Sequence, residues 1–538
     1  MSKFLNPTRV VTSKDAIYPD ALINNRDIQP LFFSYKGEEA IEGFTTIKKG
    51  GYVLVDFGKE LRGGINITVQ WAADESKCKL HIVFGESVME ALSNIGEKNA
   101  GNYHSVRDYT ISCPNMSTQR IGDTGFRFAR IEAIDSNVII NTVKAVSDVR
   151  EMEHKGTFEC NDALLNKIWE VGAYTVQLNT DEYIWDGLKR DRLVWIGDMH
   201  PETSTISAVF GKDNSIPKSL DYVNKNTPNG EWMNNIPTYS MWWVMIHHDY
   251  YMHWGDLDYL KAQEKSLTAL IDKSIALIDS NFASDDDLYE FVDWSSRYTD
   301  AAFEGRLAVF CLGFNRAAIL CDALGNTAYA DKCRKYASKL KTMTVECTLS
   351  KPMAALSVLS DRNSHNAIEL LMGNSAEDMS CFMGYYILLA KAKMGQYTEA
   401  LDMTRAYWGA MLKMGATTFW EDFDIKWLEN SAGIEEVTPE GMNDIHGDFG
   451  KHCYLQFRHS LCHGWSSGPT PFLMEQIGGI EILEPGCKKV KISPNMGDLE
   501  WIKVTYPTPY GSIKISATQK DGAISTEIDA PAEIEIVR

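Results

Sequence analysis

The chain has 538 residues, 44% of them hydrophobic, and this length predicts two or three domains. Its formal net charge of −20, with no long basic run, excludes nucleic acid and a phospholipid surface as expected partners. No apolar run is long enough to span a bilayer, and residues 1–15 lack the apolar stretch of a signal peptide. We therefore expect a cytoplasmic protein that is not bound to a membrane.

Eleven cysteines are scattered along the chain, and none of them are spaced as CxxC. This pattern predicts neither a disulfide framework nor a zinc site, and most of the cysteines are expected to be small buried hydrophobic residues. The acidic motifs described below also lack histidines at metal-ligand spacing, so no metal and no cofactor are expected. The oligomeric state is open: there are no coiled-coil heptads, and a homodimer is compatible with the sequence.

Residues 1–155 have the sequence character of β-strands. Segments 51–57, 64–70 and 79–84 are apolar or alternating and rich in β-branched residues, with turn residues such as Arg62-Gly-Gly between them. This pattern predicts an N-terminal antiparallel β-sandwich.

The hydrophobic period becomes helical over residues 156–470. Asn161 and Asp162 resemble a helix start. Apolar residues at helical spacing then recur in the stretches 164–176, 257–277, 307–320, 379–393 and 400–412. Roughly a dozen helices over this length favour a closed helical toroid rather than a four-helix bundle. Strand character returns over residues 471–538, which predicts a small C-terminal β domain.

The segment from Asp186 to Asp198 has the sequence DGLKRDRLVWIGD and the most unusual composition in the chain. A salt-bridged loop exposed to solvent is the default interpretation of so many charges. However, Trp195 indicates that the segment is anchored against the protein. The acids, including Asp191, also alternate with Arg190 and Arg192, an arrangement that can hold one carboxylate ionised while it displaces the pKa of another.

Three further fragments place a polar residue beside a tryptophan between predicted helices: Asp293-Trp294, Trp420-Glu421 and His463-Gly-Trp465. Taken singly, Glu421 could cap a helix, His463 could be a hydrogen-bonded core residue, and the tryptophans could be packing residues. Taken together, the fragments provide what glycoside hydrolysis requires. One carboxylic acid protonates the leaving oxygen, a second carboxylate activates water, and aromatic faces hold the sugar.

These fragments resemble the signatures of the bacterial α-L-rhamnosidases, the six-hairpin glycosidases. Asp186, Arg190, Asp191, Trp195 and Asp198 fall on the first signature, and Trp420-Glu421 matches the second. Asp293-Trp294 and His463 resemble further parts of the family's site. Segments 56–64, 85–86, 125–128 and 484–511 resemble its flanking β domains. The resemblance implies an (α/α)6 toroid between an N-terminal β-sandwich and a C-terminal β domain, and an inverting exo-glycosidase that releases terminal α-L-rhamnose or a related deoxy-sugar.

The resemblance also implies a role for each residue. Asp191, kept protonated by burial, would be the general acid, and Glu421 would be the general base. Asp186, Asp198 and Asp293 would bind sugar hydroxyls, and Arg190 would orient the acids. Trp195, Trp294 and Trp420 would line the apolar side of the sugar, and His463 would contact the substrate.

One position departs from the family pattern. The rhamnosidases have Glu where this chain has Asp191, and the shorter side chain withdraws the carboxyl by roughly 1.5 Å. Two alternatives therefore stay open: a six-hairpin glycosidase for a different L-sugar or an unsaturated uronide, and a carbohydrate-binding protein with a decayed site.

Overall fold

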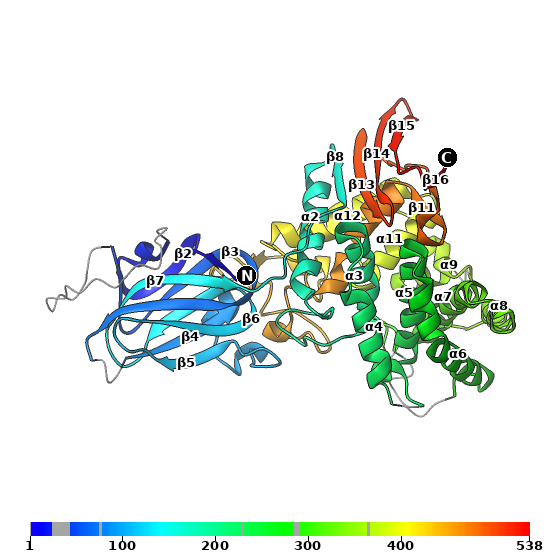
Figure 1. Ribbon diagram of the computed structural model, residues 1–538. Coiled ribbons are helices and arrows are strands. Elements are labelled where there is room, and N and C mark those ends of the chain that lie inside the picture. Colours follow the sequence, from blue (N-terminus) through cyan, green and yellow to red (C-terminus); the bar gives the residue numbers. More distant parts are fainter. Residues whose placement is uncertain are drawn as a thin grey trace.

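The computed structural model describes residues 2–23, 43–74, 78–228, 230–283, 291–297, 299–362 and 366–538. Figure 1 shows a β-rich N-terminal part on the left, a large assembly of helices on the right, and a small C-terminal β part against the helices at the top. This β–α–β order confirms the multidomain fold that the sequence predicts.

The N-terminal part is a seven-stranded antiparallel sheet that folds over on itself. Its strands are β1 (Lys3–Leu5), β2 (Arg9–Ile17), β3 (Thr45–Ala72), β4 (Lys79–Gly85), β5 (Asp108–Ser112), β6 (Ser117–Ala133) and β7 (Val138–Ser147). The order is β1-β7-β3-β6-β4-β5, with β2 paired to β3. The long strand β3 pairs with β2 through Asp56 and with β7 mainly from Gly63 onward, so it runs through both layers. Val, Ile and Phe side chains fill the core between the layers.

The middle part is a closed ring of helical hairpins. Its helices are α2 (Ala163–Asn179), α3 (Met199–Thr205), α4 (Ser215–Asn226), α5 (Pro237–Trp254), α6 (Leu257–Asp279), α7 (Ala302–Ala323), α8 (Thr327–Thr342), α9 (Lys351–Leu359), α10 (Ala367–Leu370), α11 (Met383–Lys393), α12 (Tyr397–Lys413) and α13 (Pro469–Phe472). Alternate helices contact one another in sequence from α3 through α5, α7, α9 and α11 to α13, and α13 contacts α3. This inner ring, with the other helices outside it, is the arrangement of an (α/α)6 toroid.

The sequence determines which helices lie in each ring. Helices α5 and α7 are apolar on nearly all sides and almost entirely buried, as an inner position requires. Helices α6 and α8 instead have a buried apolar stripe on one side and an exposed charged face on the other, as outer helices do. Within the described parts of the chain, no helix combines the length and the apolarity needed to cross a membrane.

The C-terminal part contains two small sheets. Strands β11 (Ile480–Glu484), β12 (Lys489–Ile492) and β16 (Glu535–Val537) form one, and β13 (Trp501–Thr508), β14 (Gly511–Lys520) and β15 (Ala523–Asp529) form most of the other. The fourth strand of the second sheet is β8 (Thr157–Cys160), which precedes the first helix of the ring and pairs with β13. Helical structure also continues through a π-helical turn to Ile477. The predicted domain boundaries remain predictions: β8 lies within the predicted helical segment 156–470 but pairs with the C-terminal sheet, and the π-helical turn lies within the predicted C-terminal segment 471–538.

Candidate active site

The predicted site residues come from three connections between helices of the ring. Asp186, Arg190, Asp191 and Trp195 lie between α2 and α3, and Asp198 directly precedes α3. The connection between α6 and α7 carries Asp293 and Trp294, and the long connection between α12 and α13 carries Trp420, Glu421 and His463. Rigid helices therefore present chemically active loops, which is a common way of building a site.

Eight of the ten predicted residues meet at one cavity of about 340 Å³. They are Asp186, Arg190, Asp191, Trp195, Asp198, Trp294, Glu421 and His463. The volume falls within the usual range for small-molecule sites. Residues that are more than two hundred positions apart in the sequence thus form a single concave site.

Arg190 joins the two carboxylates predicted to do the chemistry. Its Nη1 lies 3.0 Å from Asp191 Oδ1, and its Nη2 forms an ion pair with Glu421 Oε1. Its Nε also donates to the carbonyl oxygen of Arg458, at 3.2 Å. The guanidinium is 4% exposed, so little water screens these contacts. Arg190 therefore fixes the position of Asp191 relative to Glu421.

His463 lies among three buried carboxylates. Its Nε2 is 3.8 Å from Asp186 Oδ2, 3.9 Å from Asp198 Oδ2 and 3.7 Å from Glu421 Oε1. Burial and the nearby Arg190 charge hold the pKa of His463 well below its usual range, so the imidazole is neutral. We call Asp186, Asp198 and Glu421, arranged around His463, the carboxylate cluster.

The pKa values of this cluster are raised. Burial, reinforced by the Asp191 charge, raises the pKa of Asp186 to about 7. Burial also raises the pKa of Asp198 well above its usual range, although the Tyr239 hydroxyl donates to Asp198 Oδ1 at 2.8 Å. Burial raises the pKa of Glu421 too, while Arg190 and the Ser460 backbone N–H oppose that shift. Shifted carboxyl groups that face one cavity are typical of a catalytic site.

Asp191 does not have the burial expected of it. Its side chain is 23% exposed at the cavity, whereas Asp186, Asp198 and Glu421 are buried. The reason is local: the Asp186 carboxylate accepts the backbone N–H groups of Asp191 and Leu193, which turns this segment toward the cavity mouth. The Asp191 side chain is therefore less buried than the sequence analysis expects.

Aromatic rings line much of the cavity wall. Trp195 and Trp294 are half-buried there, as predicted, and Tyr239, Tyr454 and Trp465 join them. Trp465 also donates its indole N–H to the Glu421 carbonyl oxygen at 3.0 Å. Tyr239 lies on the almost uniformly apolar helix α5, where nothing in the sequence distinguishes it from a core residue.

Two predicted residues lie away from this cavity. Trp420 is 1% exposed and packs among Phe423 and His459 in the core, so the structure does not support its predicted place beside the sugar. Asp293 accepts hydrogen bonds from Ser295 and Ser380 and lines an adjacent cavity of about 320 Å³. The two cavities share Glu421, Tyr454 and Trp465.

Glu202 and Asn234 also support the site, although neither is among the predicted residues. Glu202 on α3 is fully buried, neither carboxylate oxygen has a hydrogen-bond partner among the described residues, and burial beside Asp198 raises its pKa well above the usual range. A Cβ atom at Gly464 would lie 1.4 Å from Glu202 Oε1, so only glycine fits there. Asn234, with φ of 50°, clamps the Trp195 loop through the Ile196 N–H and the Val194 carbonyl. In the sequence, the Asn234-Asn235 pair indicates a turn at this position, because asparagine favours turns and tolerates positive φ.

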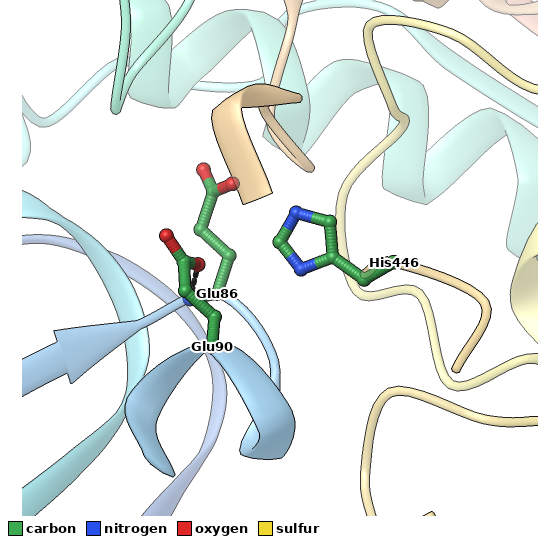
Figure 2. A group of neighbouring side chains, drawn as sticks. All are labelled: Glu86, Glu90 and His446. Atoms are coloured by element: carbon green, nitrogen blue, oxygen red, sulfur yellow. Dashed lines mark hydrogen bonds between the residues drawn. The ribbon is translucent and has the colours of Figure 1, made fainter. Parts of the chain in front are cut away.

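Two groups of side chains have metal-ligating atoms close together. One is Asp186, Asp198 and His463 at the cavity, and the other is Glu86, Glu90 and His446 between the β-sandwich and the ring (Figure 2). In the second group, Lys189 Nζ lies 3.1 Å from a carboxylate oxygen of both Glu86 and Glu90, so an ammonium already supplies the positive charge. In the first group, the acids face a cavity large enough for an organic ligand.

Comparisons with known proteins find similar sequences and similar folds. Residues 153–348 match the bacterial alpha-L-rhamnosidase six-hairpin glycosidase domain, and residues 479–537 match the C-terminal domain of the same proteins. An alpha-L-rhamnosidase of Formosa agariphila is 19% identical over 554 residues, which cover 90% of this chain and 55% of that protein. This chain thus spans about half the length of the curated relative.

Solved structures show the same fold. A rhamnosidase of Bacillus sp. GL1 has a TM-score of 0.75 at 20% identity, with 96% of this chain and 55% of that chain covered. A rhamnosidase from Klebsiella oxytoca with rhamnose bound has a TM-score of 0.61 at 18% identity, with 88% of this chain and 95% of that chain covered. The second likeness spans nearly the whole of the similar structure.

Proposed function

We propose that this chain is an inverting exo-glycoside hydrolase, because residues 153–348 and 479–537 match two domains of the bacterial α-L-rhamnosidases. Its expected substrate is a glycoside or oligosaccharide with a terminal α-L-rhamnose or a related deoxy-sugar. The observation that carries the proposal is the double ion pair of Arg190, which holds Asp191 and Glu421 on the wall of one cavity.

The spacing of the two carboxylates is compatible with inversion. Since one guanidinium contacts both side chains and such contacts reach about 3 Å, the nearest oxygens of Asp191 and Glu421 are roughly 8 Å apart or less. This bound admits the ~6.5–9.5 Å of an inverting pair, which leaves room for water beside the sugar, and also the ~5–5.5 Å of a retaining pair, so the choice of inversion rests on the family resemblance. Asp191 would protonate the leaving oxygen, and Glu421 would remove a proton from the attacking water.

The environment of Glu421 suits a general base. Burial raises its pKa toward the working pH, and the Arg190 ion pair keeps the ionised form accessible. A backbone N–H, that of Ser460, donates to Glu421 Oε2 at 2.9 Å, which fixes the carboxylate in the orientation needed to activate water. Asp191, at the more exposed end of the Arg190 bridge, is placed for a leaving group that points toward solvent.

The remaining lining suits a deoxy-sugar. Asp186, Asp198 and His463 offer acceptors and a neutral imidazole to ring hydroxyls, while Trp195 and Trp294 offer apolar faces to the ring and to a methyl group. The Klebsiella oxytoca structure with rhamnose bound supports the choice of sugar. An unsaturated uronide would need a cation to face its carboxylate; Arg190 is held by two acids of the protein itself, but Arg458 also lines the cavity, so the test panel includes an unsaturated uronide.

The test is hydrolysis of a panel of p-nitrophenyl glycosides, with NMR of the first-formed anomer. We expect p-nitrophenyl α-L-rhamnoside to be cleaved best and the first product to have the inverted configuration. Retention of configuration would overturn the assigned roles even if rhamnose proved correct. A wild type and a Glu421→Gln variant that both cleave the whole panel equally slowly would favour a carbohydrate-binding protein instead.

The cytoplasmic location and a homodimer remain proposals that stand on the sequence alone. Cell fractionation would test the first, and light scattering of the purified protein would test the second.

A further inference from the structure

Lys189 is a buried cation at the junction between the β-sandwich and the helical ring. Its Nζ lies 3.1 Å from Glu86 Oε2 and 3.1 Å from Glu90 Oε1, both at the end of β4 or in the short helix α1 (Val88–Leu92). The same Nζ donates to the carbonyl oxygens of Phe457, at 2.9 Å, and His459, at 2.6 Å. All three charged side chains are at most 4% exposed. We call Glu86, Glu90 and Lys189 the interdomain latch.

One arm of the latch leads to Glu421. Glu86 accepts hydrogen bonds from Ser460 Oγ at 3.1 Å and from the Leu461 backbone N–H at 2.6 Å. Ser460 in turn holds Glu421 twice: its N–H donates to Glu421 Oε2, and its carbonyl oxygen accepts the Glu421 N–H, each at 2.9 Å. A single residue, Ser460, therefore connects a carboxylate of the β-sandwich with the proposed general base.

The other arm leads to Asp191. Lys189 is followed directly by Arg190, whose guanidinium contacts both Asp191 and Glu421. The backbone of Lys189 is also held from the β-sandwich, because Ser105 Oγ donates to its carbonyl oxygen at 2.7 Å. The β-sandwich thus contacts both the side chain and the backbone of Lys189. The next residue, Arg190, is the one that bridges the two acids.

We infer that Glu86 and Lys189 are positioning residues through which the N-terminal β-sandwich sets the relative placement of Asp191 and Glu421. The inference rests on the proposed function of these two acids. In this arrangement the β-sandwich completes the active site without touching the substrate cavity, and the ring alone would leave both catalytic loops without their external support. Burial raises the pKa of Glu86 to about 7 while the Lys189 ammonium opposes that shift, so the ionised pair depends on the complete latch.

A binding role for the same cluster is less well supported. Figure 2 shows Glu86 and Glu90 reaching from the β-sandwich toward His446 on the opposite side. The His446 imidazole already contacts Ser87 Oγ at 2.7 Å and the His459 carbonyl oxygen at 2.9 Å. With the Lys189 ammonium between the carboxylates, the atoms that could ligate a metal already have partners in the protein.

The chain offers a matched control for a buried ion pair. Glu304 and Arg362 are 0% and 1% exposed and form a charged pair within the helical ring, with Arg362 Nε and Nη2 at 2.8 Å and 2.6 Å from the Glu304 carboxylate. Neither residue lines the substrate cavity. Glu304→Gln therefore removes the same charge as Glu86→Gln at equal burial, and the ion pair that it breaks includes none of Arg190, Asp191, Ser460 and Glu421.

The experiment compares kcat, KM and melting temperature for wild type, Glu86→Gln, Lys189→Met and Glu304→Gln on p-nitrophenyl α-L-rhamnoside. Since a misplacement of about 1 Å can cost 10²-fold in rate, we expect the two latch variants to lose roughly 10- to 100-fold in kcat with KM within about threefold of wild type. Glu304→Gln should lose thermal stability and retain its kcat per folded molecule. The pH profile of kcat should shift in the latch variants alone, because the support of Glu421 changes only there.

Ser460→Ala provides a milder variant should a latch variant fail to fold. It removes the hydroxyl link to Glu86 and leaves both backbone hydrogen bonds to Glu421, so we expect a loss of about two- to tenfold in kcat with an unchanged fold. Wild-type kcat and an unchanged pH profile in folded Glu86→Gln, or in Ser460→Ala, would overturn the inference and leave the proposed function intact. Wild type that hydrolyses no glycoside of the panel would instead overturn the proposed function.

Discussion

The interdomain latch and the carboxylate cluster are both made of buried acids, but they differ in how their oxygens are used. In the latch, both oxygens of Glu86 have donors, from Ser460, Leu461 and Lys189. In the cluster, Asp186 and Glu421 also have a protein donor at each oxygen. Asp198 differs: Tyr239 donates to its Oδ1, but its Oδ2 lies 3.9 Å from His463 Nε2, beyond hydrogen-bond distance.

The difference teaches how to separate structural from functional acids in this protein. An acid whose acceptor sites are filled by protein donors stabilises a particular backbone arrangement. An acid that is buried with spare acceptor sites destabilises the free protein until a ligand supplies donors, and sugar hydroxyls are such donors. The latch therefore holds the loops in place, and within the cluster Asp198 has acceptor capacity left for substrate.

The largest effect is expected at Glu421, which belongs to the cluster and also receives support from the latch. Glu421→Gln should lower kcat by about 10²–10⁴-fold, because the amide cannot remove a proton from water. Kinetics on p-nitrophenyl α-L-rhamnoside would measure this loss, and a melting curve would verify that the variant is folded. If the variant kept more than a tenth of the wild-type kcat, Glu421 would not be the general base, and the cluster would lose its assigned role in catalysis.

Replacement of Asp191 should produce a loss that depends on the leaving group. Asp191→Asn is expected to lose about 10²-fold in kcat/KM on a methyl rhamnoside, whose leaving alkoxide needs a proton, but about tenfold or less on the p-nitrophenyl rhamnoside. Asp191→Glu, tested in parallel, would show whether the longer side chain of the family improves or impairs the site. Equal losses on both substrates would contradict the role of general acid.

The burial of the cluster predicts a pH-dependent stability at Asp186. Its folded pKa of about 7 exceeds the ~3.9 of an unfolded Asp, so the folded state binds more protons between these values. The contribution of Asp186 to the free energy of unfolding is therefore fully present below pH ~4 and falls as the pH rises to about 7.

Asp186→Asn should remove this dependence. Compared with wild type, the variant should gain up to a few kcal/mol in relative stability between pH 4 and 7, and the difference should be constant above that range. Denaturant unfolding at several pH values would measure it, and other buried acids cancel because both proteins contain them. A wild-type-minus-variant difference that does not change with pH would mean that burial does not raise the pKa of Asp186 in the folded protein.

The smallest effect is expected from Trp294 and Trp420, which the sequence analysis assigns to the same side of the sugar. Trp294→Phe, at the cavity, should raise KM several-fold with little change in melting temperature, because a smaller ring covers less of the sugar. Trp420→Phe, in the core, should lower stability by about 1–3 kcal/mol with a smaller change in KM. A larger rise in KM for Trp420→Phe than for Trp294→Phe would mean that Trp420, and not Trp294, contacts the substrate.

The sequence predicted the fold class well because each part has a distinct period: alternation in β3 and β6, and helical spacing from Leu164 onward. It could not predict that β8 joins the C-terminal sheet, because four residues carry no signal about a distant partner. The candidate site was predictable where short motifs carry charge beside tryptophan. Tyr239 and Glu202 escaped because their roles arise from tertiary contacts alone, and Trp420 was misplaced because adjacency to Glu421 in the sequence does not fix where a ring points.

The pairing of β8 with β13 has a consequence for the order of events during synthesis. Phe158 and Cys160 of β8 are buried at 2% and 3% exposure, yet their partners Val504 and Ile502 are made only after the whole helical ring. At about 5–20 residues per second, the ribosome needs on the order of tens of seconds to cover that interval. For this time the first edge of the ring has an unpaired strand and an apolar surface. Chaperones should therefore be needed to cover this surface on the nascent chain until β13 has been synthesised and can pair with β8.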